Sequence, residues 1–327
     1  MRHFIFEFIT SGGLTNQELD FKLAQEGELM VAALVKDLKQ IPDASIALCR
    51  DARLDRSGQD IEYVVINEHP HDEIRQAIQP DDIVWLIAPE SDNCLVEWAE
   101  WFNEQNSMPL LSDIQSLRIC TSKYQTAKLF QRHDIQVIPT QRADDEISVS
   151  EHGWIVKPDD GAGAEQIMVF SDRKQLDNCL ANHGNNNNLV VQPYMKGRNM
   201  SLSMLCCDGM SVVIGCNLQN IEMQNEQMRL ESIEVNACVN ILEDFKKLAS
   251  RIAKALPGLQ GYVGIDLIEN QQGELIVVEV NPRLTTSYAG LGQSINMNMA
   301  EQILDVFQSR ALADIDINNA SSVRIQL

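Results

Sequence analysis

The side chains best suited to chemistry lie in a short stretch late in the chain, residues 261–291. Two segments rich in β-forming residues, 262–269 and 274–281, flank a polar connector that ends in glycine. Glycine tolerates the backbone conformation of a tight turn, so the pattern predicts a β-hairpin. We place its two-residue loop at Gln272 and Gly273.

This hairpin would bring two acids face to face. Counting outwards from the loop pairs Ile268 with Val277 and places Asp266 directly opposite Glu279. Because strand side chains alternate, Asn281 shares the face of Glu279. Two carboxylates that face each other across a ladder repel unless a cation lies between them, and carboxylate and amide oxygens suit magnesium bound together with phosphate. The alternative is a solvated hairpin face whose acids point into water.

Basic residues that could bind phosphate occur in three other contexts. Arg283 follows on the face of Glu279 and can donate two parallel hydrogen bonds to an anion. Lys157 ends a predicted strand and precedes the small-residue loop 158–164, in which backbone N–H groups can approach phosphate oxygens. Lys123 lies at the start of a predicted helix. Taken singly, these features are also compatible with a flexible hairpin loop and solvated lysines.

The composition is that of a globular protein: 327 residues, 44% hydrophobic and 22% charged. A formal net charge of −21 disfavours nucleic acids and anionic membranes as partners, because their phosphates would be repelled. The eight cysteines show neither a C-x-x-C pair nor zinc-like spacing, which favours free thiols in a reducing compartment. No segment resembles a signal peptide or a membrane span. We expect a cytoplasmic protein.

Strand and helix signals alternate through the first hundred residues. The expected strands are 3–9, 45–49, 62–66 and 82–88, and the expected helices are 26–39 and 92–105. This alternation predicts a small parallel sheet covered by helices. The loops with Ser11, Gly12 and Gly13 and with Glu90 would then lie at the carboxyl edge of the sheet, where such sheets bind ligands. The glycine pair is also compatible with a plain turn.

The remainder of the chain mixes hairpins with helices. The expected strands are 154–157, 166–170, 189–194, 201–206, 210–216 and 322–326, and the expected helices are 121–132, 172–182, 239–256 and 299–308. The polar segment 217–228 is predicted to be an irregular loop. We expect three domains, 1–112, 113–197 and 198–327.

Taken in order, these pieces resemble the ATP-grasp superfamily over about residues 111–310. The most specific part is GID at 264–266 followed by VEVNPR at 278–283. The resemblance implies an α/β (overall α+β) ATP-grasp fold, with a parallel-sheet pre-ATP-grasp domain, a central lid subdomain and a carboxy-terminal lobe. It implies that Asp266, Glu279 and Asn281 bind two magnesium ions, with manganese as the alternative, and that catalytic Arg283 faces the transferred phosphoryl group.

The resemblance also assigns the ATP-binding residues. Lys123 and Lys157 match the two nucleotide lysines. The lid corresponds to Gly161, Gly163 and Ala164, and the hinge that contacts adenine corresponds to Gln192, Pro193 and Tyr194. Where the family often has an acid that holds the ribose, this chain has Asn199, and Glu231 is the alternative ribose contact.

An ATP-grasp site implies an ATP-dependent carboxylate–amine ligase that forms an amide through an acyl phosphate. The segment FEFITSGGL at 6–14, with Glu26 and Gly27 expected ahead of the first helix, is similar to the tyramine–glutamate ligase group of methanofuran-type cofactor biosynthesis. That similarity implies glutamate and tyramine, or a related aryl amine, as small-molecule substrates. The candidate substrate contacts are Ser11, Gly12, Gly13, Glu90 and Ser287, while the neighbouring Tyr288 has plain packing as its alternative.

Two other functions stay open. One is an ATP-grasp ligase for other amino acids, and the other is a nucleotide-binding protein with a degenerate site. A homodimer is compatible with either.

Overall fold

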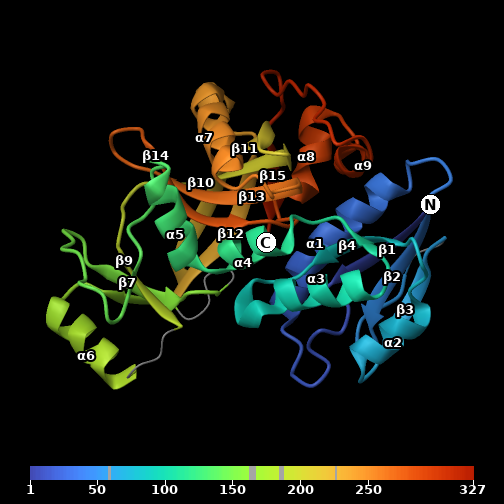
Figure 1. Ribbon diagram of the computed structural model, residues 1–327, viewed down its shortest axis with the longest axis horizontal. Coiled ribbons are helices and arrows are strands. Elements are labelled where there is room, and N and C mark those ends of the chain that lie inside the picture. Colours follow the sequence, from blue (N-terminus) through green and yellow to red (C-terminus); the bar gives the residue numbers. More distant parts are fainter. Residues whose placement is uncertain (58–59, 162–166, 184–187, 225–226) are drawn as a thin grey trace.

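Three β-sheets form the framework of the computed structural model, which describes residues 1–57, 60–161, 167–183, 188–224 and 227–327 (Figure 1). One sheet is parallel and the other two are antiparallel. This confirms the predicted α/β class and the parallel sheet near the amino terminus. None of the described helices is both long and apolar enough to cross a membrane.

The parallel sheet has the order β3-β2-β1-β4-β5. Its strands are β1 (Arg2–Glu7), β2 (Ser45–Asp51), β3 (Glu62–Ile66), β4 (Ile83–Ile87) and β5 (Met108–Pro109). Its helices are α1 (Phe21–Leu38), α2 (Pro70–Ala77) and α3 (Cys94–Glu104), the last preceded by the 3-10 turn η1 (Ser91–Asn93). Buried Leu34 of α1 belongs to the core on one face of the sheet with Ile5, whereas Ile74 of α2 and Phe102 of α3 belong to the core on the other face with Phe6. Each face is thus covered by helices, as the alternating pattern predicts.

The first helix begins earlier than predicted. Asp20 caps α1 by accepting hydrogen bonds from the backbone N–H groups of Lys22 and Leu23. Glu26 and Gly27, which the sequence placed at the helix start by periodicity and ahead of it by the family resemblance, therefore lie inside the helix. The amphipathic pattern becomes clear only after the first turn, and for that reason periodicity alone placed the start too late.

The larger antiparallel sheet has the order β14-β13-β10-β11-β12-β15. Its strands are β10 (Arg198–Cys207), β11 (Met210–Gln224), β12 (Gln227–Val235), β13 (Gly261–Glu269), β14 (Leu275–Asn281) and β15 (Val323–Gln326). The helices of this part are α7 (Leu242–Ala255), preceded by η2 (Val239–Ile241), α8 (Tyr288–Ile295) and α9 (Met299–Ser309).

The prediction that 217–228 is an irregular loop is wrong. Strand β11 continues through most of this segment and pairs with β12. Polar side chains do not break the strand here because they find partners on the sheet: Asn217 donates to Ser201 Oγ (3.2 Å), and Asn220 donates to Ser232 Oγ (3.0 Å).

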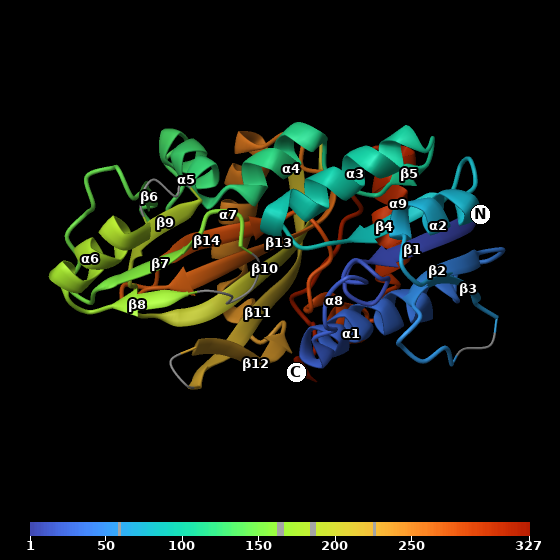
Figure 2. The ribbon, with the colours of Figure 1, turned by 90° about the horizontal axis from the view of Figure 1, so that it is seen from below.

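A smaller antiparallel sheet with the order β6-β9-β7-β8 lies between these parts in the sequence. Its elements are β6 (Gln141–Arg142), β7 (Trp154–Pro158), β8 (Met168–Phe170), α6 (Arg173–His183) and β9 (Leu189–Pro193). Two helices, α4 (Ile114–Thr121) and α5 (Lys123–Arg132), precede it. Figure 2 shows α3, α4 and α5 in a row along one side of the molecule, where they connect the parallel sheet to the antiparallel sheets. The three-domain division of the chain stays a prediction.

A glycine in α1 yields a stability test. A Cβ added at Gly27 would lie 2.4 Å from Oε2 of Glu7, a buried carboxylate fixed by the N–H and hydroxyl of Thr10 (2.8 and 2.7 Å). Helix propensity favours alanine by about 1 kcal/mol, but overpacking costs about 1–3 kcal/mol. We expect Gly27→Ala to lower the free energy of unfolding in urea, whereas Gln25→Ala, at an exposed position of the same helix, changes it by less than about 0.5 kcal/mol. A Gly27→Ala protein at least as stable as wild type would contradict this packing.

Candidate active site

The hairpin of β13 and β14 brings the two predicted acids together. Asp266 pairs directly with Glu279, as the sequence predicts. Gln219 of β11, two strands away in the sheet, donates to Oδ1 of Asp266 (2.8 Å), and Asn281 of the adjacent β14 donates to Oδ2 (3.1 Å). Because Asn281 uses its N–H group on Asp266, its amide oxygen is the atom available to a cation.

The hairpin reaches the predicted pairing of the two acids through a different loop and a different register near the loop. The backbone N–H of Asn270 bonds the carbonyl of Glu274 (3.0 Å), so the loop has three residues instead of two, and Ile268 pairs with Ile276 and not with the predicted partner. A register shift between Asp266 and the following residue leaves Val278 as an extra residue, a β-bulge. The longer loop and the bulge offset each other, and the acids therefore face each other as predicted.

The charges around the pair are unequal. Burial raises the pKa of Asp266, and the charge of Glu279 raises it further. Burial would also raise the pKa of Glu279, but Lys123 and Lys157 outweigh it and lower that pKa. Nζ of Lys123 lies 3.4 Å from Oε2 of Glu279. The lysines thus outweigh burial at Glu279, whereas the pKa of Asp266 stays raised.

This donor set fits magnesium. Two carboxylates and an amide oxygen are hard ligands, and magnesium is commonly bound by one or two carboxylates together with phosphates and water. Within the described part of the chain, no group of three or more His, Cys, Asp or Glu side chains forms a fuller metal cage. The raised pKa of Asp266 has the sign expected where a positive charge would relieve repulsion between two acids.

The two predicted nucleotide lysines both reach this site. Lys157 is buried, and its pKa is lowered to about 8, mainly by burial; the charge of Lys123 acts in the same direction, while Glu279 and Asp266 oppose the shift. Lys123 is also buried, and its Nζ donates to the carbonyl oxygen of Gly161. Two cations held side by side in a chain of charge −21 form a local site for a polyanion.

Asp159 positions Lys123 at the start of α5, a role that the sequence did not reveal. Its carboxylate accepts from the hydroxyl of Ser122 (2.6 Å) and from the N–H of Tyr124 (2.7 Å), and its carbonyl oxygen accepts from the N–H of Lys123 (3.0 Å). A carboxylate at a helix N-terminus is favourable. The only signal in the sequence is its place two residues after Lys157.

Arg283 contacts the amino-terminal part of the chain. Its Nε and Nη2 donate to Oε1 and Oε2 of Glu90 (3.0 and 2.7 Å). Three residues further on, the hydroxyl of Thr286 donates to Glu26 of α1. The structure thus joins Glu90 to Arg283, two residues to which the sequence assigned separate roles, and adds Glu26 to the surroundings of the site.

The other predicted substrate contacts have internal partners. Ser11 is buried, donates to the carbonyl of Cys49 (2.9 Å) and accepts from the N–H of Glu7 (3.1 Å). Gly12 has a φ of +83° in the turn after β1, and Gly13 follows it in the same turn. Ser287 is buried with its Oγ 3.5 Å from Oγ of Ser201. Their contacts with substrate stay predictions.

Tyr288 packs inside the protein. Its side chain is buried and its hydroxyl donates to Asp37 of α1 (2.7 Å). This is the packing alternative that the sequence left open.

The predicted adenine hinge lies at the end of β9. Gln192 is buried and donates to Thr140 Oγ1 (2.8 Å), Pro193 ends the strand, and the N–H of Tyr194 bonds the carbonyl of Gly153 (2.8 Å). The predicted lid residues Gly163 and Ala164 lie outside the described residues.

The ribose contact stays a prediction. Asn199 lies on β10 opposite Ile268. The alternative contact, Glu231, lies two strands away, at the irregular position of β12.

With this geometry established, comparison with known proteins identifies the class. A family model described as an ATP-grasp domain matches residues 120–287, and one described as a pre ATP-grasp 3 domain matches residues 44–115. The chain therefore belongs to the ATP-grasp family. The predicted fold and the predicted class, an ATP-dependent carboxylate–amine ligase, are confirmed.

Individual relatives are distant but extend along most of the chain. Tyramine–L-glutamate ligase of Methanocaldococcus jannaschii is 20% identical over 307 residues, which cover 91% of this chain and 87% of that protein. An ATP-grasp superfamily protein from Archaeoglobus fulgidus has a TM-score of 0.74 at 18% identity, covering 100% of this chain and 92% of that chain. An L-amino acid ligase from Bacillus licheniformis has a TM-score of 0.66 at 14% identity, covering 98% and 77%. The first relative belongs to the group that the amino-terminal segment resembles.

The paired acids yield a test of the site. In Glu279→Gln, the partner of Lys123 loses its charge and the magnesium site loses a carboxylate. We expect magnesium-dependent ADP formation to fall by about 100-fold or more, the size of effect seen when one electrostatic contact at a transition state is removed. Glu269→Gln is the matched control, because Glu269 ends β13 in an ion pair with the half-exposed Arg198. Magnesium-dependent turnover that survives in Glu279→Gln would show that the metal assignment is wrong.

Proposed function

We propose that this protein joins the γ-carboxylate of glutamate to the amine of tyramine, or of a related aryl amine, at the expense of ATP. The observation that carries the proposal is the carboxylate pair Asp266–Glu279 with Lys123 beside it, a site suited to phosphate and magnesium. The choice of substrates is supported by the similarity to tyramine–L-glutamate ligase along 91% of the chain.

The reaction has two steps. A γ-carboxylate oxygen attacks the γ-phosphorus of ATP, the bond to the bridging oxygen breaks, and ADP leaves with that electron pair. The amine nitrogen then attacks the carbonyl carbon of the acyl phosphate, the C–O bond breaks, and inorganic phosphate leaves. The ammonium form of the amine gives one proton to solvent before the attack and a second to phosphate or solvent after it, and the third stays on the nitrogen of the amide product.

The residues of the site have separate roles in this reaction. Lys123 and Lys157 hold the ATP phosphates. Asp266, Glu279 and Asn281 would hold two magnesium ions, with manganese able to replace them, and the metal would neutralise charge on the phosphate oxygens. Positioning and charge stabilisation account for most catalysis of phosphoryl transfer, so no nucleophilic side chain is needed.

The substrates would approach from the amino-terminal part of the chain. The turn with Ser11, Gly12 and Gly13 lies at the carboxyl edge of the parallel sheet, where sheets of this kind bind ligands. Ser287 follows the hairpin and neighbours Thr286, the residue that contacts Glu26. We place the reaction in the cytoplasm, since all eight cysteines are free thiols, and a homodimer remains a compatible assembly.

A substrate screen tests the proposal. We expect ADP release from magnesium-ATP to require both glutamate and tyramine, and the product to have the mass of the two joined with loss of one water. Glutamine is the matched control for the acid, because it keeps the α-carboxylate and lacks the γ-carboxylate, and it should give no product.

Other results of the screen would point elsewhere. ADP release with other amino acids but not with glutamate and tyramine would indicate a different ligase. ATP binding without turnover for any pair of acid and amine would indicate a degenerate site.

A further inference from the structure

The contact between Glu90 and Arg283 joins two parts of the chain that are 193 residues apart. It is a two-point contact, with Nε–Oε1 and Nη2–Oε2 distances of 3.0 and 2.7 Å. Only 14% of the Arg283 side chain and 4% of the Glu90 side chain are exposed. Such paired hydrogen bonds fix the plane of a guanidinium as well as its position.

Arg283 has N–H groups that could bond a second anion while Glu90 holds it. Besides the two bonds to Glu90, its Nη1 donates to the carbonyl of Leu284 (3.3 Å). A guanidinium has five N–H donors, so one on Nη1 and one on Nη2 are left unused by the contacts within the described residues. Such N–H groups can donate hydrogen bonds to oxygens of a phosphoryl group.

Substrate is a poor competitor for Glu90 at this arginine. A buried carboxylate that loses its partner is strongly destabilising, and within the described residues Glu90 has no hydrogen-bond partner other than Arg283. Displacement of Glu90 by a substrate carboxylate would leave that charge uncompensated. The pair is therefore expected to persist while the substrates bind.

The loop that carries Glu90 is itself held in place. Asp92 and Asn93 adopt positive φ angles of 53° and 60°, which are uncommon for residues other than glycine. The N–H of Leu95 bonds the carbonyl of Pro89 (2.9 Å), and the N–H of Asp92 bonds Oδ2 of Asp160 (3.1 Å). The same loop thus contacts Arg283 and the segment next to Asp159, which positions Lys123.

We propose that Glu90 is a positioning residue, which holds Arg283 with its two remaining N–H groups toward the transferred phosphoryl group. This revises the predicted role of Glu90 as a substrate contact. The inference rests on the proposed function, because it assumes that Arg283 faces the phosphoryl group.

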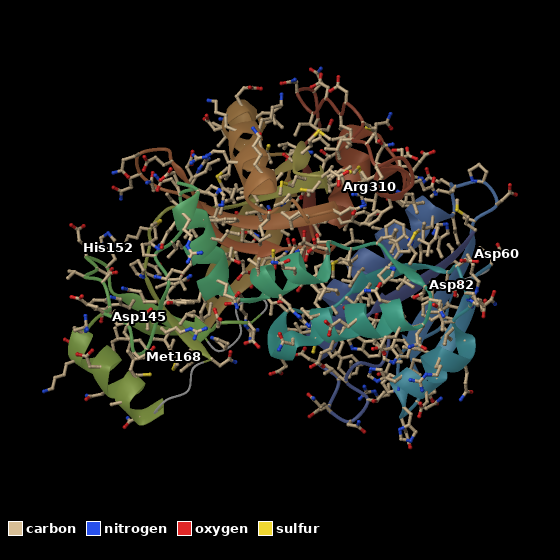
Figure 3. All side chains as sticks on the ribbon, viewed as in Figure 1. Asp60, Asp82, Asp145, His152, Met168 and Arg310 are labelled. Carbon is tan, nitrogen blue, oxygen red and sulfur yellow. The ribbon has the colours of Figure 1, made fainter. Side chains whose placement is uncertain are left out.

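A matched pair of variants separates this role from plain stability. Glu90 follows the carboxyl end of β4, and Asp82 precedes the amino end of the same strand. Figure 3 labels Asp82 in the amino-terminal part of the molecule. Asp82 is also buried and forms an ion pair with Arg2 (2.5 Å), away from the hairpin. Glu90→Gln and Asp82→Asn each remove the charge from one buried ion pair of the same domain, and both are expected to lower the unfolding temperature.

Only Glu90→Gln is expected to change the chemistry. We expect its kcat to fall roughly 100-fold, the size of effect of a 1 Å misplacement, with the KM values for acid and amine within about threefold of wild type. Asp82→Asn should keep the wild-type kcat. Glu90→Asp, which keeps the charge, should recover part of the loss, and Glu90→Gln added to Arg283→Lys should be no slower than Arg283→Lys alone.

A binding measurement tests the inference without any turnover. Aluminium fluoride mimics a transferring phosphoryl group when it binds with magnesium-ADP. Glu90→Gln should weaken ADP binding in the presence of aluminium fluoride and leave the binding of ADP alone unchanged, while Asp82→Asn changes neither. If no pair of substrates turns over and this difference is still seen, the proposed function fails and the role of Glu90 stands.

Two outcomes would overturn the inference. One is a Glu90→Gln protein that matches Asp82→Asn in kcat and in aluminium fluoride-dependent binding, because Glu90 would then serve stability alone. The other is a raised KM for acid or amine with an unchanged kcat, which would show that Glu90 contacts the substrate.

Discussion

Repulsion between two largely buried carboxylates is the constraint on which the site depends. Asp266 and Glu279 face each other across a hairpin ladder, where like charges destabilise the pair. The protein compensates only part of this charge, because Lys123 and Lys157 lower the pKa of Glu279 while the pKa of Asp266 stays raised. The site therefore still favours binding of a cation, such as the magnesium that is bound to ATP.

Burying these two lysines costs free energy, and contacts with the surrounding residues offset that cost. Burial lowers the pKa of Lys157, so its charge depends on the nearby acids. Lys123 is held by Asp159, which bonds the backbone at the start of α5 and the hydroxyl of Ser122. The acids and lysines thus stabilise one another. A bound polyanion would compensate the remaining charge of the lysines, and its magnesium would compensate that of the acids.

The amino-terminal sheet contributes to this site through the segment that follows the hairpin. Arg283 contacts Glu90, Thr286 contacts Glu26, and Tyr288 contacts Asp37. These contacts explain why an amino-terminal domain that would select substrates can be coupled to the phosphoryl-transfer groups. A ligase needs such coupling, since the acyl phosphate must form beside the amine that consumes it.

The sequence by itself determined the hairpin, its paired acids, the lysines and most of the parallel sheet, because strand alternation and amphipathic periodicity are local properties. It also led to the correct pairing of Asp266 with Glu279 through a loop that was one residue too short, an error that the bulge at Val278 offset. The polar composition of residues 217–228 led to the wrong prediction of a loop, because polar residues of β11 have hydrogen-bond partners on other strands of the sheet. Only the tertiary structure decided that Glu90 holds Arg283 and that Asp159 holds Lys123, because these contacts join residues 193 and 36 positions apart and no local pattern records a long-range hydrogen bond.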